Sequence, residues 1–304
     1  QKMASSKRLT VTLLIAFLTV LLLPSTASAW TSNDGAVSIH APSTSAGAVE
    51  GVLVDSSGNV YACGWYRGNF DVDPDPDITE IVGGAGHNQP VLSKYNTSGN
   101  LIWARLLDAN DTGVMNDCAI STDQAYIAVT GDYKGTMDVD GAGSMATITS
   151  GSEWDAYVAL INASTGAVVW VKGLGGEEVV EGLGVDFGPG NEVYVTGRMR
   201  GTVDINFDPG TTTTWESKSL DSWLTKLSVG GTVEWAHAWG DDGSDQIFDV
   251  AVDRDNHHIY VGGFASTLSG GRDWDPDPDD EVLIMVESGT GHQAAMARYD
   301  STGD

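Results

Sequence analysis

Closely spaced aspartates are the residues of this sequence whose type and spacing most directly indicate chemistry. They occur in four acidic turns, at residues 68–77, 135–141, 201–210 and 271–280. Carboxylates at every second position of an extended chain project from one side of it. Oxygen ligands so spaced suit Ca²⁺, which takes about 6–8 of them. The predicted calcium ligands are Asp71, Asp73, Asp75, Asp77, Asp138, Asp140, Asp204, Asn206, Asp208, Asp273, Asp275, Asp277 and Asp279.

A purely structural interpretation of these turns competes with calcium binding. Aspartate side chains accept hydrogen bonds from backbone N–H groups in turns, and proline stiffens the chain around them. None of the four turns has the complete twelve-residue pattern of an EF-hand loop. For any single turn the structural interpretation is favoured. Because the acidic turns recur and are rich in aspartate, calcium binding stays an alternative, above all in the first and last turns.

Other residue types do not form a recognisable catalytic group. The six histidines are scattered, and the adjacent pair His257-His258 would point to opposite faces of a strand. No nucleophile elbow, zinc-binding helix motif or phosphate-binding loop occurs in the sequence. Paired carboxylates are abundant, but none stands out as a glycosidase acid/base pair. We therefore assign no catalytic residue and no organic cofactor.

The acidic turns belong to a longer repeating unit. Glycines in equivalent segments fall at Gly64, Gly131, Gly197 and Gly263, which are 67, 66 and 66 residues apart. The tryptophans Trp103, Trp170 and Trp235 follow the same period, with steps of 67 and 65. A fixed period of this size is the signature of a repeat architecture.

Each unit contains four short apolar segments separated by Gly-, Asn- and Ser-rich turns, a pattern typical of β-strands. No segment has a sustained 3.6-residue apolar period, so no helix is predicted beyond residue 29. Four strands per unit predict an all-β protein, a β-propeller with about four four-stranded blades over residues 30–304. The segment 36–40 would complete the fourth unit and close the ring. The alternative is that the chain is a fragment of a larger propeller.

In the predicted propeller, the three repeated tryptophans lie buried between neighbouring blades.

Residues 1–29 have the features of a secretory signal peptide. Lys7 and Arg8 precede an apolar run, residues 11–23, and Ala27-Ser28-Ala29 is a small-x-small cleavage site. These 29 residues hold three of the 15 basic residues and none of the 42 acidic ones, so the remainder has a net charge of −30. Such a surface repels nucleic acid and anionic lipid and attracts cations. The predicted location is secreted or cell-surface, with no membrane insertion after cleavage.

Two cysteines are too few for a disulfide scaffold. Export permits one bridge, but Cys63 falls in the second strand of one unit and Cys118 in the first strand of the next. On this ground we expect two separate buried thiols.

The repeat resembles the bacterial secreted β-propeller (SBBP) repeat. The resemblance rests on residues 183–186 with 190–197, on Asp221–Leu227 and on residues 168–176, and at repeat level it covers about residues 36–304. It implies a propeller in an exported or cell-surface protein and carries no motif for an activity. Residues 165–170 also look like the tryptophan repeat of quinone-cofactor dehydrogenases, but a packing tryptophan without a cofactor is favoured.

The expected function is a non-catalytic binding or structural module, of surface or adhesion type, stabilised by calcium. Its partner would be an extracellular protein or polysaccharide. The alternative is an extracellular hydrolase or lyase with its site in the central funnel of the propeller. An enzyme needs converging ionisable residues that differ between blades, whereas a scaffold presents similar residues from each.

Overall fold

The computed structural model describes residues 45–74, 81–139, 147–208, 210–240, 242–266, 284–285 and 292–303. These residues form β-strands joined by turns, with no helix among them, as the sequence predicts. The strands are β1 (Ala46–Val54), β2 (Val60–Asp71), β3 (Ile81–Tyr95), β4 (Leu101–Leu106), β5 (Asp108–Ala109), β6 (Thr112–Ile120), β7 (Tyr126–Lys134), β8 (Thr136–Asp138), β9 (Thr147–Thr149), β10 (Asp155–Asn162), β11 (Val168–Leu174), β12 (Val180–Phe187), β13 (Val193–Asp204), β14 (Thr214–Leu227), β15 (Val233–Trp239), β16 (Asp245–Asp253), β17 (His258–Ser266), β18 (Ile284–Met285) and β19 (His292–Tyr299).

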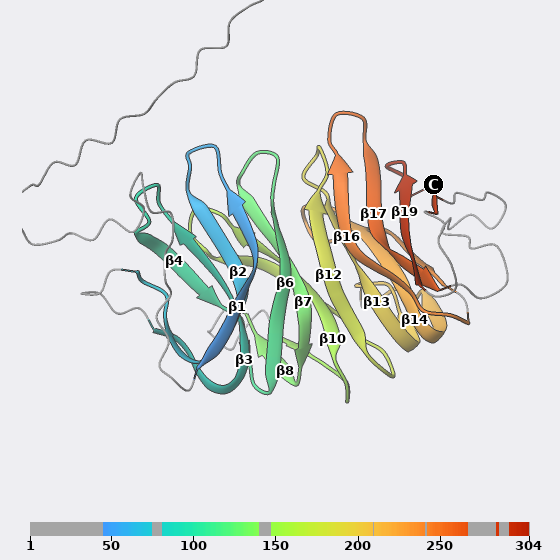
Figure 1. The fold of residues 1–304 in the computed structure, drawn as a ribbon, viewed down its shortest axis with the longest axis horizontal. Helices are drawn as coiled ribbons and strands as arrows, with labels where there is room; N and C mark the ends of the chain where they lie inside the picture. The colour runs from blue at the N-terminus through green and yellow to red at the C-terminus, as the bar shows by residue number, and fades with distance from the viewer. Residues whose placement is uncertain are drawn as a thin grey trace, which may run out of the picture.

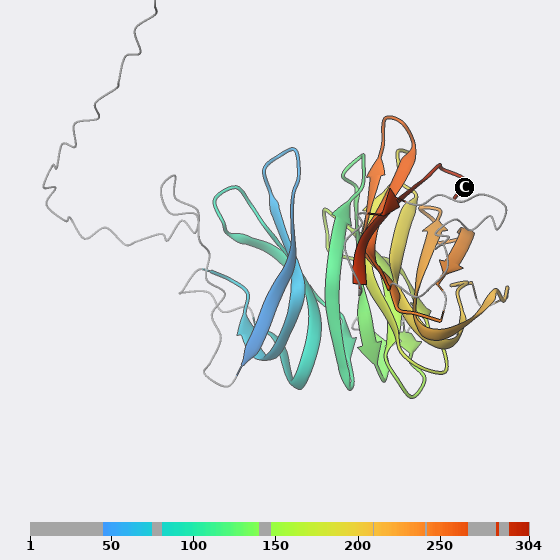
Figure 2. The ribbon, with the colours of Figure 1, turned by 45° about the vertical axis from the view of Figure 1, so that its right-hand side comes forward.

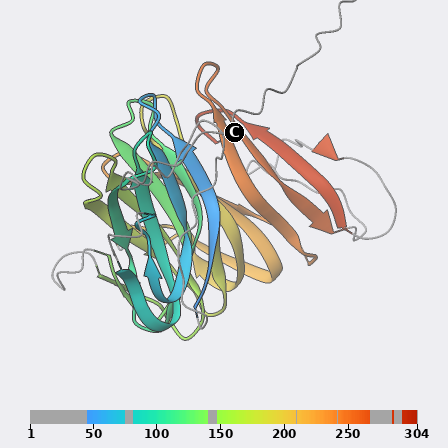
Figure 3. The ribbon, with the colours of Figure 1, turned by 60° about the vertical axis from the view of Figure 1, so that its left-hand side comes forward.

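Four antiparallel four-stranded sheets follow one another in chain order (Figures 1 and 2). The first sheet has the order β1-β2-β3-β4, the second β11-β10-β7-β6, the third β12-β13-β14-β15 and the fourth β16-β17-β19-β18. A small sheet, β5-β8-β9, joins the first and second units. The all-β prediction is confirmed. In Figure 1 the sheets lie side by side in a row, and in Figure 3 the fourth sheet, in orange and red, lies to one side of the others. The described residues form no closed ring, so propeller closure stays a prediction.

Backbone geometry repeats with the predicted period. The turn between the first two strands of each sheet has a residue with positive φ, at Gly58, Gln124, Asn191 and His257. The first strand of every sheet also has one irregularity in its pairing, between residues 49 and 51, 115 and 117, 182 and 184, and 247 and 249. The four units are therefore structural repeats as well as sequence repeats.

Each inner sheet contributes its two faces to two different cores. In β10, Tyr157, Ala159 and Ile161 pack toward the first sheet. The alternate residues of the same strand, Ala156, Val158 and Leu160, pack toward the third. This alternation follows from the two-residue period of a strand. A third core, which includes Leu224 and Val261, lies between the third and fourth sheets. The large cores therefore lie between neighbouring sheets.

A disulfide joins Cys63 of β2 to Cys118 of β6, with the two Cα atoms 6.4 Å apart. The prediction of two separate thiols was wrong. It weighed the positions of the two cysteines along the chain, but the first and second sheets stack face to face. Both side chains point into the core between these sheets, where they meet beside Gly51.

The repeated tryptophans pack against the next sheet. An added Cβ at Gly166 would lie 2.9 Å from the Trp103 ring, and one at Gly231 would lie 3.1 Å from Trp170. Both glycines have positive φ, in the turn between the last two strands of the following sheet. At the third seam, an added Cβ at Gly303 would lie 2.5 Å from His237 and 3.3 Å from the Trp235 ring. The predicted placement between sheets is confirmed, although the three side chains are partly rather than fully buried.

Hydrogen bonds fix two of these rings in place. The indole N–H of Trp170 donates to the carbonyl oxygen of Val229 at 2.9 Å, across the seam between the second and third sheets. The indole N–H of Trp235 donates to the carbonyl oxygen of Ser301 at 3.3 Å. The glycine beneath each ring lets the backbone of the next turn approach the ring face closely.

We predict that this contact is worth measurable stability. Trp170→Ala should lower the free energy of unfolding by about 2–4 kcal/mol, through lost apolar area and a cavity. Gly231→Ala should cost about 1–2 kcal/mol, because its φ is positive and the new methyl group meets the ring. Gly210→Ala is the control, since an added Cβ there meets nothing within 4 Å. Urea unfolding measures the stability of the three variants. If Gly231→Ala and Gly210→Ala were equally stable, the contact between Gly231 and the Trp170 ring would be contradicted.

Candidate functional site

The third acidic turn, at the end of β13, is the best described of the four. The Asp204 carboxylate accepts hydrogen bonds from the backbone N–H groups of Asn206 at 3.2 Å and Thr213 at 2.8 Å. The Asn206 side-chain oxygen accepts from the backbone N–H of Asp208 at 2.9 Å. The side chains of Asp204 and Asn206 therefore stabilise the third turn by accepting backbone hydrogen bonds, as the structural interpretation of these turns expects.

Asp208 links this turn to the second sheet. Its carboxylate lies 2.5 Å from the ammonium group of Lys172 on β11 and also accepts from the backbone N–H of Val233 at 3.1 Å. The hydrogen bond from Lys172 lowers the pKa of Asp208 below its usual value. The third turn thus contributes an ion pair across the seam between two sheets.

The other predicted calcium ligands are only partly described. In the first turn, the Asp71 carboxylate accepts from the backbone N–H of Asp73 at 3.2 Å, and Asp138 ends β8. Among the residues that the structure describes, no three His, Cys, Asp or Glu side chains form a group that could hold a metal ion. Seven predicted ligands lie outside those residues: Asp75, Asp77, Asp140, Asp273, Asp275, Asp277 and Asp279.

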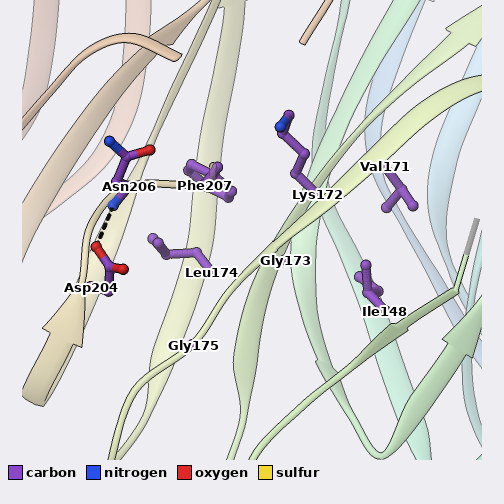
Figure 4. Close-up of a pocket in the computed structure, with 9 residues that line it drawn as sticks. All are labelled: Ile148, Val171, Lys172, Gly173, Leu174, Gly175, Asp204, Asn206 and Phe207. Carbon is purple, nitrogen blue, oxygen red and sulfur yellow. Dashed lines mark hydrogen bonds between the residues drawn. The ribbon is translucent and has the colours of Figure 1, made fainter. Parts of the chain in front are cut away.

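A pocket of about 380 Å³ lies beside the third turn, where β11 of the second sheet faces the chain after β13 (Figure 4). Figure 4 shows Asp204 and Asn206 on one side of it, Lys172 on the other, and Leu174 and Phe207 between them. The complete lining is Ile148, Val171, Lys172, Gly173, Leu174, Gly175, Asp204, Asn206 and Phe207.

The polar groups of this pocket already have structural partners. Asp204 and Asn206 accept hydrogen bonds from the backbone of the turn, and Lys172 is paired with Asp208. The rest of the lining is aliphatic, aromatic or glycine. This arrangement favours binding of a small ligand over acid–base catalysis, which needs a proton donor or acceptor aimed at the ligand.

A second polar group, which the sequence analysis missed, runs across the second, third and fourth sheets. Asn116 on β6 donates from its side-chain amide to the Asp132 carboxylate at 2.6 Å and to the carbonyl oxygen of Gly182 at 2.9 Å. Arg198 on β13 is ion-paired with Glu181 of β12. It also donates to the side-chain oxygen of Gln246 on β16 at 2.6 Å.

A sequence signal for this group existed. Asp132 and Arg198 each follow one of the repeated glycines, Gly131 and Gly197, whereas Trp65 and Phe264 hold the same position in the other two units. The chemical type of this residue therefore changes from unit to unit. Ionisable residues that differ between units are the feature expected of a functional site, and this position of the repeat has it.

Burial dominates the electrostatics here. It raises the pKa of Asp132 to about 8, helped by the nearby Glu181 charge and opposed by Asn116 and Arg198. On the neighbouring strand β6, burial raises the pKa of Asp117 to about 6, against a hydrogen bond from the backbone N–H of Val185. At neutral pH the Asp132 carboxyl is therefore mainly protonated.

We predict that Asp132 makes the fold less stable as the pH rises. Its pKa in the folded state lies above the unfolded value near 3.9, so the folded state binds the extra proton and stability falls between about pH 4 and pH 8. Asp132→Asn, which keeps the oxygen that accepts from Asn116, should stabilise the protein at pH 8 by at least about 1 kcal/mol and flatten the pH profile.

Thermal unfolding from pH 5 to pH 8 measures this effect, with the exposed Asp255→Asn as the control. If Asp132→Asn and the parent protein have parallel pH profiles, Asp132 is ionised in the folded state across this range.

The chain has a distant and partial similarity to a known regulatory protein. No protein-family model matches the sequence. The chain is 26% identical over 171 residues to the regulatory protein FlaEY of Caulobacter vibrioides, a match that covers 55% of this chain and 17% of that protein. The matched part is thus about a sixth of the length of FlaEY.

Among the described residues, no helix is long and apolar enough to cross a membrane.

Proposed function

We propose that the protein is an exported, non-catalytic binding or structural module built from β-propeller repeats of the SBBP type. The observation that carries this proposal is the recurrence of the same seam contacts from sheet to sheet. Trp103, Trp170 and Trp235 each lie against a positive-φ glycine of the next sheet. Repetition of one contact along the chain is what a scaffold needs, because each sheet is stabilised by its neighbours.

A second set of seam contacts supports the same proposal. Lys94 on β3 donates to the carbonyl oxygen of Ala163, in the turn after β10 of the second sheet, at 3.0 Å. Lys226, at the equivalent place on β14, donates to the carbonyl oxygen of Ser301 after the fourth sheet at 3.3 Å. The equivalent lysines thus serve packing between sheets in two separate units.

The disulfide supports export. Disulfides form and persist mainly in oxidising compartments such as the periplasm and the extracellular space. Cys63–Cys118 joins two sheets of this chain, and no free cysteine remains. Together with the predicted signal peptide at residues 1–29, it favours a secreted or cell-surface location.

Exposed apolar side chains support a propeller arrangement. On β1 of the first sheet, Val52 and Val54 are 60% and 61% exposed and alternate with Leu53, which packs on the core. On β19 of the fourth sheet, Met296 is 48% exposed between the buried Ala295 and Ala297. Each end of the row thus offers a partly apolar sheet face of the kind that a further blade covers in a propeller.

Expression from residue 1 in a bacterial host tests export and binding together. The proposal expects oxidised protein, cleaved near Ala29, in the periplasm or medium. It also expects retention on extracellular polysaccharide or surface protein without change in that partner. Retention in the cytoplasm with reduced cysteines contradicts export. Time-dependent release of new sugar ends or unsaturated products supports the alternative, an extracellular hydrolase or lyase.

We also propose that the first and last acidic turns bind calcium. A net charge near −30 makes the folded chain repel itself, and a bound cation relieves part of that repulsion. For an extracellular site with a Kd of about 10⁻⁴–10⁻³ M, millimolar Ca²⁺ should add about 1 kcal/mol of stability per site. We expect Asp73→Asn combined with Asp75→Asn to remove part of this gain, and Asp111→Asn to leave it unchanged.

The control is NaCl at equal ionic strength, because salt screening also stabilises an acidic protein. Equal melting temperatures in calcium and in matched NaCl would show that these turns are structural only.

A further inference from the structure

A pocket of about 430 Å³ lies between the third and fourth sheets. A volume of this size falls within the usual range for small-molecule sites, about 300–1,000 Å³. Strands β13 and β14 supply one part of its lining, and β16, β17 and the turn before β16 supply the rest. The lining is Arg200, Lys218, Ser219, Leu220, Ser244, Gln246 and Phe264.

The charge of this lining is opposite to that of the protein. The whole sequence holds 42 acidic and 15 basic residues, yet the lining has two basic residues and no acidic one. The side chains of Arg200 and Lys218 are 57% and 71% exposed, so solvent and ligands reach both. The lining therefore carries two cationic hydrogen-bond donors, and their carboxylate neighbours Glu178, Asp242, Glu216 and Asp221 lie just outside it.

Gln246 forms a fixed polar part of the lining. It is 5% exposed; its side-chain oxygen accepts from Arg198 at 2.6 Å, and its amide donates to the Ser244 hydroxyl at 2.8 Å. Because the Ser244 oxygen accepts this bond, its own proton is left to donate. Ser219 adds a second hydroxyl. Most of the hydrogen bonds offered to a ligand here are therefore donated by the protein.

Phe264 provides an aromatic wall. Its ring packs against Phe248, with the ring centroids 5.4 Å apart, and Leu220 adds aliphatic surface to the lining. An aromatic face next to directed polar donors suits a ring that has one apolar face and polar edges, since small-molecule sites combine apolar walls with a few placed polar groups.

Both cations have carboxylate partners that a ligand could replace. Arg200 pairs with Glu178 at 2.9 Å, and Lys218 pairs with Asp242 at 2.7 Å. All four side chains are about half or more exposed. Exposed pairs of this kind contribute only about 0–1 kcal/mol, so an incoming carboxylate can take the place of either partner at little cost.

We propose that this pocket binds a carboxylated sugar, with the carboxylate on Lys218 and Arg200, the ring against Phe264 and the ring hydroxyls on Ser219 and Ser244. The proposal rests on the proposed function and specifies its ligand as an acidic sugar unit of a polysaccharide. Within such a polysaccharide, an isolated acidic unit is favoured over a continuous run of them, because the net negative charge of the protein repels a long polyanion.

Titration calorimetry of the whole chain with D-galacturonate, D-galactose and acetate tests the proposal. We expect galacturonate to bind at least about tenfold more tightly than either of the others, a difference of about 1.4 kcal/mol. Lys218→Ala should weaken binding severalfold, and Asp242→Asn should strengthen it, because the competing carboxylate is removed. Lys134→Ala, at a similar exposed ion pair on the second sheet, is the matched control and should have no effect.

The two variants should change galacturonate affinity in opposite directions, Lys218→Ala lowering it and Asp242→Asn raising it. If Lys218 and Asp242 formed only a structural ion pair, both variants would lose the same contact and have the same effect. Galactose or acetate binding as tightly as galacturonate overturns the proposal, as does absence of galacturonate binding at millimolar concentration. A Lys218→Ala variant that binds galacturonate like the parent also overturns it, while leaving the binding-module function intact. Turnover of an acidic oligosaccharide would instead contradict the non-catalytic function and leave the pocket in place.

Discussion

The large apolar cores of this molecule lie between sheets, and the rest of the structure depends on that constraint. A strand such as β10 has two apolar faces, and only the neighbouring sheets can cover them. Each inner sheet therefore needs a neighbour on both sides. The seam contacts then set how closely neighbours approach: the glycine under each tryptophan, the lysines that reach the next turn, and the Cys63–Cys118 bond. The fold gains its stability from the stack rather than from any single unit.

Much of this could be predicted from the sequence because it depends on period. The repeated glycines and tryptophans located the four units, and short apolar segments bounded by Gly-, Asn- and Ser-rich turns located the strands. The seam between sheets could not be predicted in the same way, since it depends on which faces meet. Cys63 and Cys118 are 55 residues apart and became a bonded pair only through face-to-face stacking. The partial burial of the tryptophans has the same origin: each ring is covered by a turn of the next sheet, which the sequence does not locate in space.

The acidic turns show how far residue type alone can be interpreted. In the third unit, Asp204 and Asn206 hold the turn, and Asp208 binds Lys172 of the sheet before it. The same spacing of carboxylates therefore serves the backbone in at least one unit. The cationic pocket was not foreseen, because its residues come from separate segments around 200, 219, 245 and 264, which no local motif connects. The polar group around Asp132 was missed although its position in the repeat is regular.

The disulfide has a consequence for what a single backbone cut does to the fold. It joins two neighbouring sheets, and 54 residues of chain lie between its two cysteines. A protease that cuts this stretch once, for example at the exposed residues Asn110 and Asp111, leaves both pieces covalently attached. The core between the first and second sheets keeps its two halves together after such a cut, until a reductant breaks the bond. One bond thus keeps the first and second sheets assembled after a single cut between its cysteines.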